Sequence, residues 1–173
     1  MKNDQPFLTE LESSLYNSVL DICSGFQEKD RFYCLVLAYD VEHPLPPVLG
    51  LGLESERTSW IEEEKKDAKD FIWNPAEFTH FDIEELEIVS GETKRLCLDW
   101  DRKTNEPGKL PEARKILIGI AKKLNELDWS KHLAVTTDFI VYTVDFEGTD
   151  LKENFAHILS ESQVQNFKNK KIF

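Results

Sequence analysis

The strongest constraint on the fold is one short run of the sequence: from Phe32 to Tyr39 every residue is apolar or aromatic. Apolar side chains then point to both sides of this segment, which is typical of a strand buried on both faces. We expect a central strand over Arg31–Asp40. The run is far shorter than the roughly 20 apolar residues of a membrane-spanning helix, and no charged-then-apolar secretory pattern precedes it. The sequence therefore predicts a soluble, cytoplasmic protein rather than an integral membrane protein.

Two segments show the spacing of amphipathic helices. Apolar side chains recur at steps of three and four residues from Phe7 to Phe26 and again from Leu110 to Leu127. The first set is Leu8, Leu11, Leu15, Val19, Ile22 and Phe26, and the second is Leu110, Ala113, Leu117, Ile120, Leu124 and Leu127. This spacing puts each set on one face of a helix, and we expect both faces to pack on the sheet.

Further elements are indicated by local patterns. Strands are predicted at Val48–Glu54, at Arg95–Asp101, where apolar and polar residues alternate, and at Asp138–Phe146. Short helices are predicted at Trp60–Lys69, Asp82–Ile88, Asp150–Leu159 and Ser160–Lys170. The 173 residues fit a single domain over residues 1–173. We therefore predict an α+β fold, with a mainly antiparallel or mixed sheet of about four or five strands packed by two long helices and shorter C-terminal helices.

The charge of the chain is strongly negative and unevenly placed. There are 21 basic and 33 acidic residues, a net charge of −12, and residues 54–92 alone carry 13 acidic against 4 basic side chains. Lys and Arg neutralise phosphate backbones and anionic membranes, so this balance argues against nucleic acid and membrane as partners. It favours a basic protein, because complementary fields raise the association rate. The simpler interpretation, in which these carboxylates are solvated faces that keep the protein soluble, stays open.

The densest aromatic stretch of the chain, residues 71–81, lies inside this acidic region. Aromatic anchors dominate the binding energy of many protein interfaces, and acidic neighbours would steer a basic partner towards them. The candidate partner-binding residues are the rings Trp60, Trp73 and Phe78 and the carboxylates Glu62, Glu63, Glu64, Glu84, Glu85 and Glu87. The alternative is that the rings close one end of the core over a loop that contains Pro75.

No local pattern predicts a metal, a cofactor or a nucleophile. The four histidines are far apart, and none lies three or four residues from another His or a Cys, as in many metal sites. The three cysteines fall in apolar segments, where a thiol is normally inert, and phosphate-binding, dinucleotide-binding and nucleophile-elbow motifs are absent from the sequence. The remaining candidates for chemistry are Asp99 and Asp101, expected on one face of a strand, together with His80.

Two segments carry a resemblance to a known group of proteins. They are the Phe-Tyr strand Arg31–Asp40 with the Pro-rich link into Gly50–Arg57, and the strand Thr137–Tyr142 closed by the turn Asp145–Gly148. In this arrangement the chain resembles an uncharacterised family of small bacterial single-domain proteins, over residues 8–172. Members of such families often look like the immunity proteins of bacterial toxin systems, which are small, acidic and catalytically inert. The resemblance implies an inhibitor that binds a toxin, and its motifs carry no catalytic signature.

The sequence is compatible with three classes of function. The first is a non-enzymatic acidic protein-binding domain, in one form an immunity-type inhibitor, that covers a basic toxin or another basic protein with residues 54–92. The alternative is a small-ligand-binding protein or a hydrolase-like enzyme with a carboxylate and histidine site at Asp99, Asp101 and His80. The third is a subunit held in a larger assembly through the aromatic stretch. No cofactor and no metal is predicted for any of them, and the sequence leaves the oligomeric state open.

Overall fold

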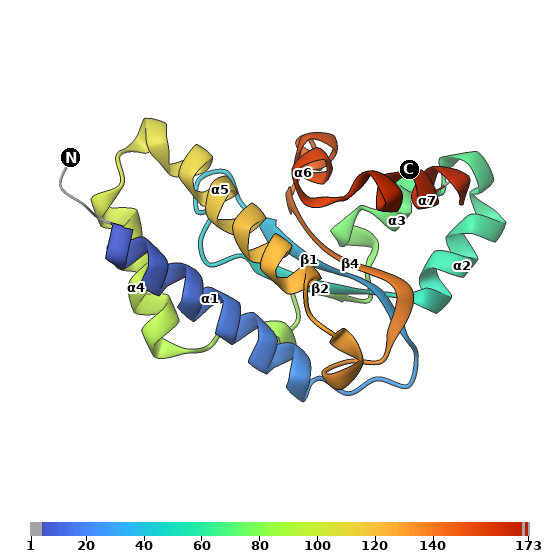
Figure 1. Cartoon of the computed structure of the whole chain (residues 1–173), viewed down its shortest axis with the longest axis horizontal. Helices are drawn as coiled ribbons and strands as arrows, with labels where there is room; N and C mark the ends of the chain where they lie inside the picture. The colour runs from blue at the N-terminus through green and yellow to red at the C-terminus, as the bar shows by residue number, and fades with distance from the viewer. Residues whose placement is uncertain (1–4, 171, 173) are drawn as a thin grey trace.

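A four-stranded sheet runs through the computed structural model, which describes residues 5–170 and 172 (Figure 1). Its strands, in the spatial order β3-β2-β1-β4, are β1 (Phe32–Tyr39), β2 (Val48–Leu53), β3 (His80–Phe81) and β4 (Val135–Asp145). β1 pairs antiparallel with β2 and parallel with β4, while β2 pairs antiparallel with β3. The predicted α+β class with a mixed sheet is confirmed, and so is the central position of β1.

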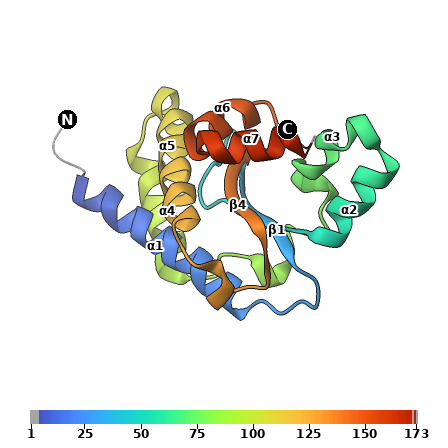
Figure 2. The same ribbon diagram turned by 45° about the vertical axis from the view of Figure 1, so that its right-hand side comes forward.

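Helices lie on both sides of this sheet (Figure 2). On one side of β1 and β4 are α1 (Gln5–Gly25), α4 (Gly91–Lys103) and α5 (Glu106–Asn125). On the other side are α2 (Glu54–Glu63) and α3 (Lys69–Ile72), and across the top of the view lie α6 (Leu151–Ile158) and α7 (Glu161–Asn169). Single 3-10 turns are η1 (Lys65–Asp67), η2 (Pro75–Glu77), η3 (Glu84–Leu86) and η4 (Trp129–Lys131). No helix within the described ranges is long and apolar enough to cross a membrane.

The core forms where the predicted apolar faces meet the sheet. All eight residues of β1 are buried, as expected for a strand with apolar side chains on both faces. The long helices bury the predicted stripes, with Leu11, Leu15 and Val19 of α1 and Ala113, Leu117, Ile120 and Leu124 of α5 at most 1% exposed. Burying one such leucine stabilises the fold by about 1.5–3 kcal/mol, so these two faces make a large favourable contribution to folding.

Two glycines let large side chains pack directly on the backbone of β2. A Cβ atom added to Gly52 would lie 2.6 Å from Cε1 of Tyr33 and 2.8 Å from Sγ of Cys34. A Cβ atom on Gly50 would lie 2.9 Å from Cδ2 of Phe81. Because real Cβ atoms do not approach other atoms this closely, β2 accepts only glycine at these positions while its neighbours keep their places.

The segment Arg95–Asp101 is helical and lies inside α4, so the predicted strand there is wrong. The alternation of apolar residues suggested a strand, but the buried residues are Leu96, Cys97 and Trp100, which share one face of a helix. Leu98, which a half-buried strand would also have buried, is 57% exposed. The helix is therefore selected by burial against α1 rather than by the local alternation.

Two other predicted helices differ from the observed elements. The acidic helix expected over Trp60–Lys69 begins earlier, at the start of α2, where the Glu56 carboxylate accepts a hydrogen bond from the Leu53 N–H at 3.0 Å. It also ends earlier, and the chain continues through η1 into α3. The helix predicted over Asp82–Ile88 is the single turn η3. The C-terminal helices α6 and α7 lie close to their predicted bounds.

A buried ion pair joins α2 to β4. Arg57 Nη1 and Nη2 donate hydrogen bonds to the two carboxylate oxygens of Asp138 at 2.9 and 3.1 Å, and both side chains are 6% exposed. Lys170, at the end of α7, donates to the same carboxylate at 2.6 Å. Burial by itself would raise the pKa of Asp138, but the hydrogen bonds from Arg57 and Lys170 outweigh it and hold that pKa well below its usual value.

From Val141 to Asp145, the outer edge of β4 is covered by amide and carboxylate side chains. The Asn125 side chain donates to the Val141 carbonyl at 2.7 Å and accepts from the Val141 N–H at 2.8 Å. The Asn154 side chain donates a hydrogen bond to the Thr143 carbonyl at 3.0 Å, and the Asp150 carboxylate accepts one from the Asp145 N–H at 3.0 Å. Backbone groups that would otherwise be unpaired at this edge are thereby satisfied.

Candidate functional site

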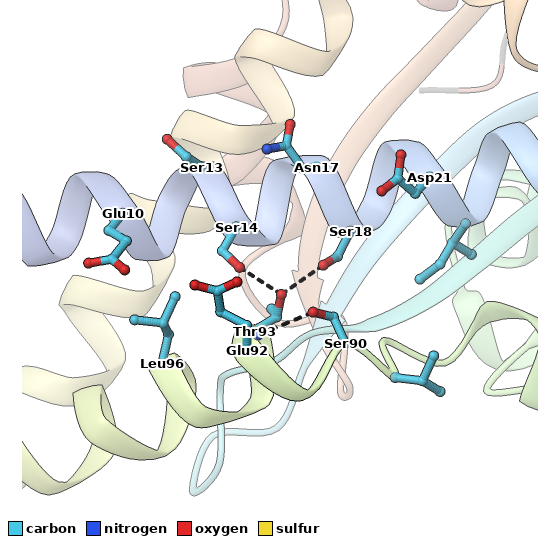
Figure 3. Close-up of a pocket in the computed structure, with 12 residues that line it drawn as sticks. Glu10, Ser13, Ser14, Asn17, Ser18, Asp21, Ser90, Glu92, Thr93 and Leu96 are labelled. Carbon is cyan, nitrogen blue, oxygen red and sulfur yellow. Dashed lines mark hydrogen bonds between the residues drawn. The ribbon is translucent and has the colours of Figure 1, made fainter.

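A hollow of about 510 Å³ lies between α1 and α4 (Figure 3). Its lining contains five hydroxyl side chains, one amide, three carboxylates and three apolar side chains. These are Ser13, Ser14, Ser18, Ser90, Thr93, Asn17, Glu10, Asp21, Glu92, Ile22, Val89 and Leu96. No Lys or Arg is among them, so the lining carries only negative formal charge.

The sequence of α1 places one row of these groups along a single helix face. Glu10, Ser14, Asn17 and Asp21 follow one another at steps of four, three and four residues, so they form a polar stripe. This stripe extends about 16 Å along the helix at 1.5 Å per residue. The other wall is the first part of α4, where the Ser90 hydroxyl accepts a hydrogen bond from the Thr93 N–H at 3.4 Å and caps the helix.

Three hydroxyls form the floor of the hollow. Thr93 is 1% exposed, and its Oγ1 lies 2.7 Å from Ser14 Oγ and 2.8 Å from Ser18 Oγ (Figure 3). Each hydroxyl has one proton and two lone pairs, so the two bonds within the trio leave more free acceptors than donors. The surrounding carboxylates only accept hydrogen bonds when they are ionised. The hollow is therefore suited to a ligand rich in N–H donors, such as a Lys or Arg side chain.

A second hollow, of about 640 Å³, continues from the first along the end of α1. Asp21 and Ile22 line both hollows, and the second is also lined by Gly25, Phe26, Gln27, Glu28, His80, Ile83 and Glu85. We call the two together the α1 groove. Its carboxylates are Glu10, Asp21, Glu28, Glu85 and Glu92, and neither part of the groove is lined by Lys or Arg.

These carboxylates differ in whether the fold gives them a charged partner. Glu28 lies 3.4 Å from Nε2 of His80. The hydrogen bond from the Lys29 N–H is the largest cause that lowers the pKa of Glu28, and the nearby imidazole lowers it further. Glu10, Asp21, Glu85 and Glu92 have no ion pair with any residue in the described part of the chain. Their charges are thus free to attract a partner.

His80 closes the far end of the groove between two phenylalanine rings. Its ring makes edge contacts with Phe26 and Phe32, at centroid distances of 5.1 and 6.1 Å. The Nε2 atom is buried and has no hydrogen-bond partner of good geometry in the described residues, although Glu28 lies within ion-pair distance. His80 thus combines a packed ring with one nitrogen that retains its capacity for a hydrogen bond.

The rings predicted to anchor a partner lie mostly in the core. Trp73 and Phe78 are 4% and 5% exposed, so they offer a partner little surface, although Trp73 lines a hollow of about 380 Å³. Trp73 packs edge-on against Tyr142 and donates a hydrogen bond from Nε1 to the Ile172 carbonyl at 2.5 Å. Trp60 is half-buried and stacks on Phe78 at a centroid distance of 6.2 Å. The alternative interpretation, that these rings close one end of the core, describes Trp73 and Phe78.

The predicted steering carboxylates lie in three different surroundings. Glu62, Glu63 and Glu64 are exposed at the end of α2, and residues 62–70 together carry five acidic and three basic side chains, so the lysines there offset only part of the negative charge. Glu87 forms an ion pair with Lys94 at 2.7 Å, and Glu84 is exposed on η3. Glu85 lines the α1 groove. The structure therefore brings only one of these six carboxylates into the groove.

The structure also separates the residues of the predicted carboxylate and histidine site. Asp99 and Asp101 lie on α4 and are held in ion pairs with Arg95 at 3.0 Å and Lys109 at 2.9 Å. The end of α4 packs on the start of α1, where Lys103 lies 3.8 Å from the ring centroid of Phe7. His80 packs near the other end of α1, about 27 Å away along the helix. A shared site for these three side chains is therefore excluded.

The three cysteines and the potential metal ligands of the described residues show no reactive arrangement. Burial raises the pKa of Cys23 and of Cys97 to about 12, and it raises the pKa of Cys34 further, so the thiols stay protonated at neutral pH. Among residues 5–170 and 172, no three His, Cys, Asp or Glu side chains converge in a way that could hold a metal ion. No cysteine lines the groove, so the groups it offers a ligand are hydroxyls, carboxylates, one imidazole and amides.

Four of the groove carboxylates, Glu10, Asp21, Glu28 and Glu92, are not among the residues predicted from the sequence to bind a partner. The signal that could have found Glu10 and Asp21 is the polar stripe of α1, which lies beside its apolar stripe. Nothing local connects that stripe to Glu92, because α4 meets α1 only through the tertiary fold.

Comparison of this chain with protein-family models, with curated proteins and with solved structures gives no match.

Proposed function

We propose that this chain is a non-enzymatic protein-binding domain that captures a basic protein through the α1 groove. The observation that carries this proposal is the set of four carboxylates, Glu10, Asp21, Glu85 and Glu92, that line the groove without a cation from the described residues. Opposite charges across an interface steer the encounter and select the partner. The acceptor-rich floor around Thr93 adds hydrogen bonds for the same cationic side chains.

The groove also supplies apolar contact, which a purely electrostatic surface lacks. Val89 is 67% exposed at its rim, and Ile22 and Ile83 line its walls. A partner segment that carries Lys or Arg beside an apolar residue would satisfy both features. This combination distinguishes the groove from the end of α2, where acidic and basic side chains are mixed.

The form of this function that best fits the resemblance is an immunity-type inhibitor that covers a basic toxin. Such an inhibitor needs no catalytic group, and it gains from an acidic surface that accelerates capture of a basic target. The buried cysteines and the absence of a metal cluster from the described residues are compatible with a binding role.

The test compares two sets of charge reversals that change the net charge equally. The first carries Glu10→Lys, Asp21→Lys and Glu92→Lys in the groove, and the second carries Glu62→Lys, Glu63→Lys and Glu64→Lys on α2. The partner is isolated by affinity capture from the source organism's lysate at low and at moderate salt, identified by mass, and then titrated against the purified variants. At about 0.5–1 kcal/mol per exposed charge, the groove variant should bind roughly ten-fold to a hundred-fold more weakly.

The α2 variant should retain its affinity, and all proteins should keep their melting temperature within a few degrees. Equal weakening by both variants would show that only net charge matters, and unchanged binding by the groove variant would refute the proposed surface. A partner that is not basic would refute the proposed chemistry.

A small cationic ligand is the second candidate, because the hydroxyl floor under Ser14, Ser18 and Thr93 is a defined hydrogen-bonding surface rather than an open rim. Titration with spermidine separates the two candidates. Saturable binding that is tighter than that of a Lys-rich peptide, and that is lost with Thr93→Val, would favour the small ligand.

A further inference from the structure

A second hollow differs from the α1 groove in the sign of its charge. It has a volume of about 490 Å³ and lies between α5 and α6, and Figure 1 shows α5 between this side of the molecule and α1. Its lining consists of four basic side chains, one carboxylate and three small or apolar residues. These are Arg114, Lys115, Lys122, His157, Glu153, Pro111, Ile118 and Gly119. With His157 counted as neutral, this lining has three cations and one carboxylate, in a chain of net charge −12.

Helix geometry places two of the cations at the two ends of the hollow. Lys115 and Lys122 are seven residues apart on α5, so they lie on one face and are separated by about 10 Å along the axis. Gly119 lies between them on that face, and a Cβ atom added there would meet nothing within 4 Å. The space above Gly119 is therefore open. Neither lysine has an ion pair with any residue in the described part of the chain.

Arg114 is held in a fixed position at the wall. Its Nε lies 3.1 Å from a carboxylate oxygen of Asp150, and its Nη2 donates to Asn154 at 2.8 Å. Asn154 is fully buried and is itself fixed by its hydrogen bond to the Thr143 carbonyl. The guanidinium therefore does not have to be ordered when a ligand arrives, which lowers the entropic cost of binding.

The Glu153 carboxylate already occupies the face of Arg114 that a bound anion would contact. The Glu153 carboxylate lies 3.1 Å from Arg114 Nη2, and its side chain is 63% exposed. An exposed ion pair of this kind contributes little to stability, so an external anion can displace it at little cost. The place of the Glu153 carboxylate lies in the same hollow as the unpaired ammonium groups of Lys115 and Lys122.

We propose that this hollow binds a small phosphate-bearing anion, whose phosphate replaces the Glu153 carboxylate on Arg114 while Lys115 and Lys122 neutralise its remaining charge. A phosphate presents several acceptor oxygens and up to two negative charges, which matches one guanidinium and two flexible ammonium groups. The apolar floor of Pro111 and Ile118 accommodates the uncharged part of the ligand. The hollow has the volume of a typical small-molecule site. This site is independent of the α1 groove.

The experiment is a titration of the full chain with pyrophosphate, followed by two-dimensional NMR of the backbone amides at constant ionic strength. We expect saturable shifts centred on Gly119 and its neighbours. Glu153→Gln should tighten binding about three-fold to five-fold, because it removes the competing anion. The double variant Lys115→Gln/Lys122→Gln should weaken binding at least about ten-fold, because it removes two charges.

The matched control is Lys66→Gln/Lys168→Gln, which removes the same charge from exposed lysines elsewhere and should leave the affinity within about two-fold. Equal weakening by the two double variants would show non-specific attraction and overturn the site. So would the absence of shifts around Gly119 at millimolar pyrophosphate, or weaker binding by Glu153→Gln. A Glu-rich peptide that binds there more tightly than pyrophosphate would overturn the small-phosphate assignment in favour of an acidic protein segment.

Discussion

The substitution Asp138→Asn would remove the charge that compensates the buried Arg57 guanidinium. Among the described residues, Arg57 would keep the Glu54 carboxylate, which lies 2.5 Å from Nη2 and is 36% exposed, and the Tyr33 ring, whose centroid lies 4.8 Å from Cζ. Removing one partner of a buried ion pair costs about 3–5 kcal/mol, since the other charge is left without compensation in a poorly solvated place. Because Glu54 remains, we expect the lower end of that range, about 3 kcal/mol.

This loss should be visible in thermal and urea unfolding. For a chain of this length, 1 kcal/mol corresponds to about 2–4 °C, so the melting temperature should fall by about 6–12 °C. The control is Lys170→Gln, which removes the other, more exposed donor to the same carboxylate. An exposed partner contributes about 0–1 kcal/mol, so the control should lower the melting temperature by only a few degrees.

The pH dependence gives an independent check. The folded state holds the pKa of Asp138 below its value in the unfolded chain, which is about 3.9. The stabilisation is therefore fully present above that unfolded value and is lost as the pH falls towards the lower pKa of the folded state. The difference in unfolding free energy between the native protein and Asp138→Asn should be constant from pH 8 to about pH 5 and should shrink below about pH 4. A difference that persists unchanged to pH 2, or a smaller loss than that of Lys170→Gln, would refute the reasoning.

Two further outcomes follow from close packing and burial. Gly52→Ala should destabilise the fold by about 1–3 kcal/mol in urea unfolding, because its Cβ would overlap the Tyr33 ring, whereas Gly25→Ala, which meets nothing within 4 Å, should cost nothing comparable; equal effects would contradict this. With their pKa raised to about 12 by burial, Cys23 and Cys97 should react with a thiol reagent at pH 8 far more slowly in the native protein than in urea, and equal rates would show that the thiols are accessible.

The helices and strands that can be predicted from the sequence are those whose apolar residues pack in the same core. The stripes of α1 and α5 and the apolar run of β1 each reflect burial against a single core, so local periodicity is sufficient. The segment Arg95–Asp101 is different, because its alternation fits a strand while α4 buries neighbouring residues against α1. Local pattern and tertiary contact then disagree, and the tertiary contact determines the structure.

The location of the acidic surface depends on tertiary structure for a similar reason. Counting charges along the chain directs attention to residues 54–92, yet the lysines beside Glu62, Glu63 and Glu64 offset part of that charge locally. The α1 groove draws its carboxylates from segments that are distant in sequence, and only the packing of α4 and η3 on α1 brings them together. The burial of Trp73 likewise depends on the C-terminal segment that receives its hydrogen bond.

The side chains that cover β4 from Val141 to Asp145 restrict how another protein can bind to this edge of the sheet. An exposed strand edge invites a second chain to extend the sheet, either as a recognition mode or as the first step of fibril growth. At Val141 the amide of Asn125 supplies the same donor and acceptor that a fifth strand would supply. Asn154 and Asp150 do the same further along the strand, at the Thr143 carbonyl and the Asp145 N–H. A partner that approaches this stretch of β4 meets a backbone whose hydrogen bonds are already made, so recognition there depends on side chains and not on strand addition.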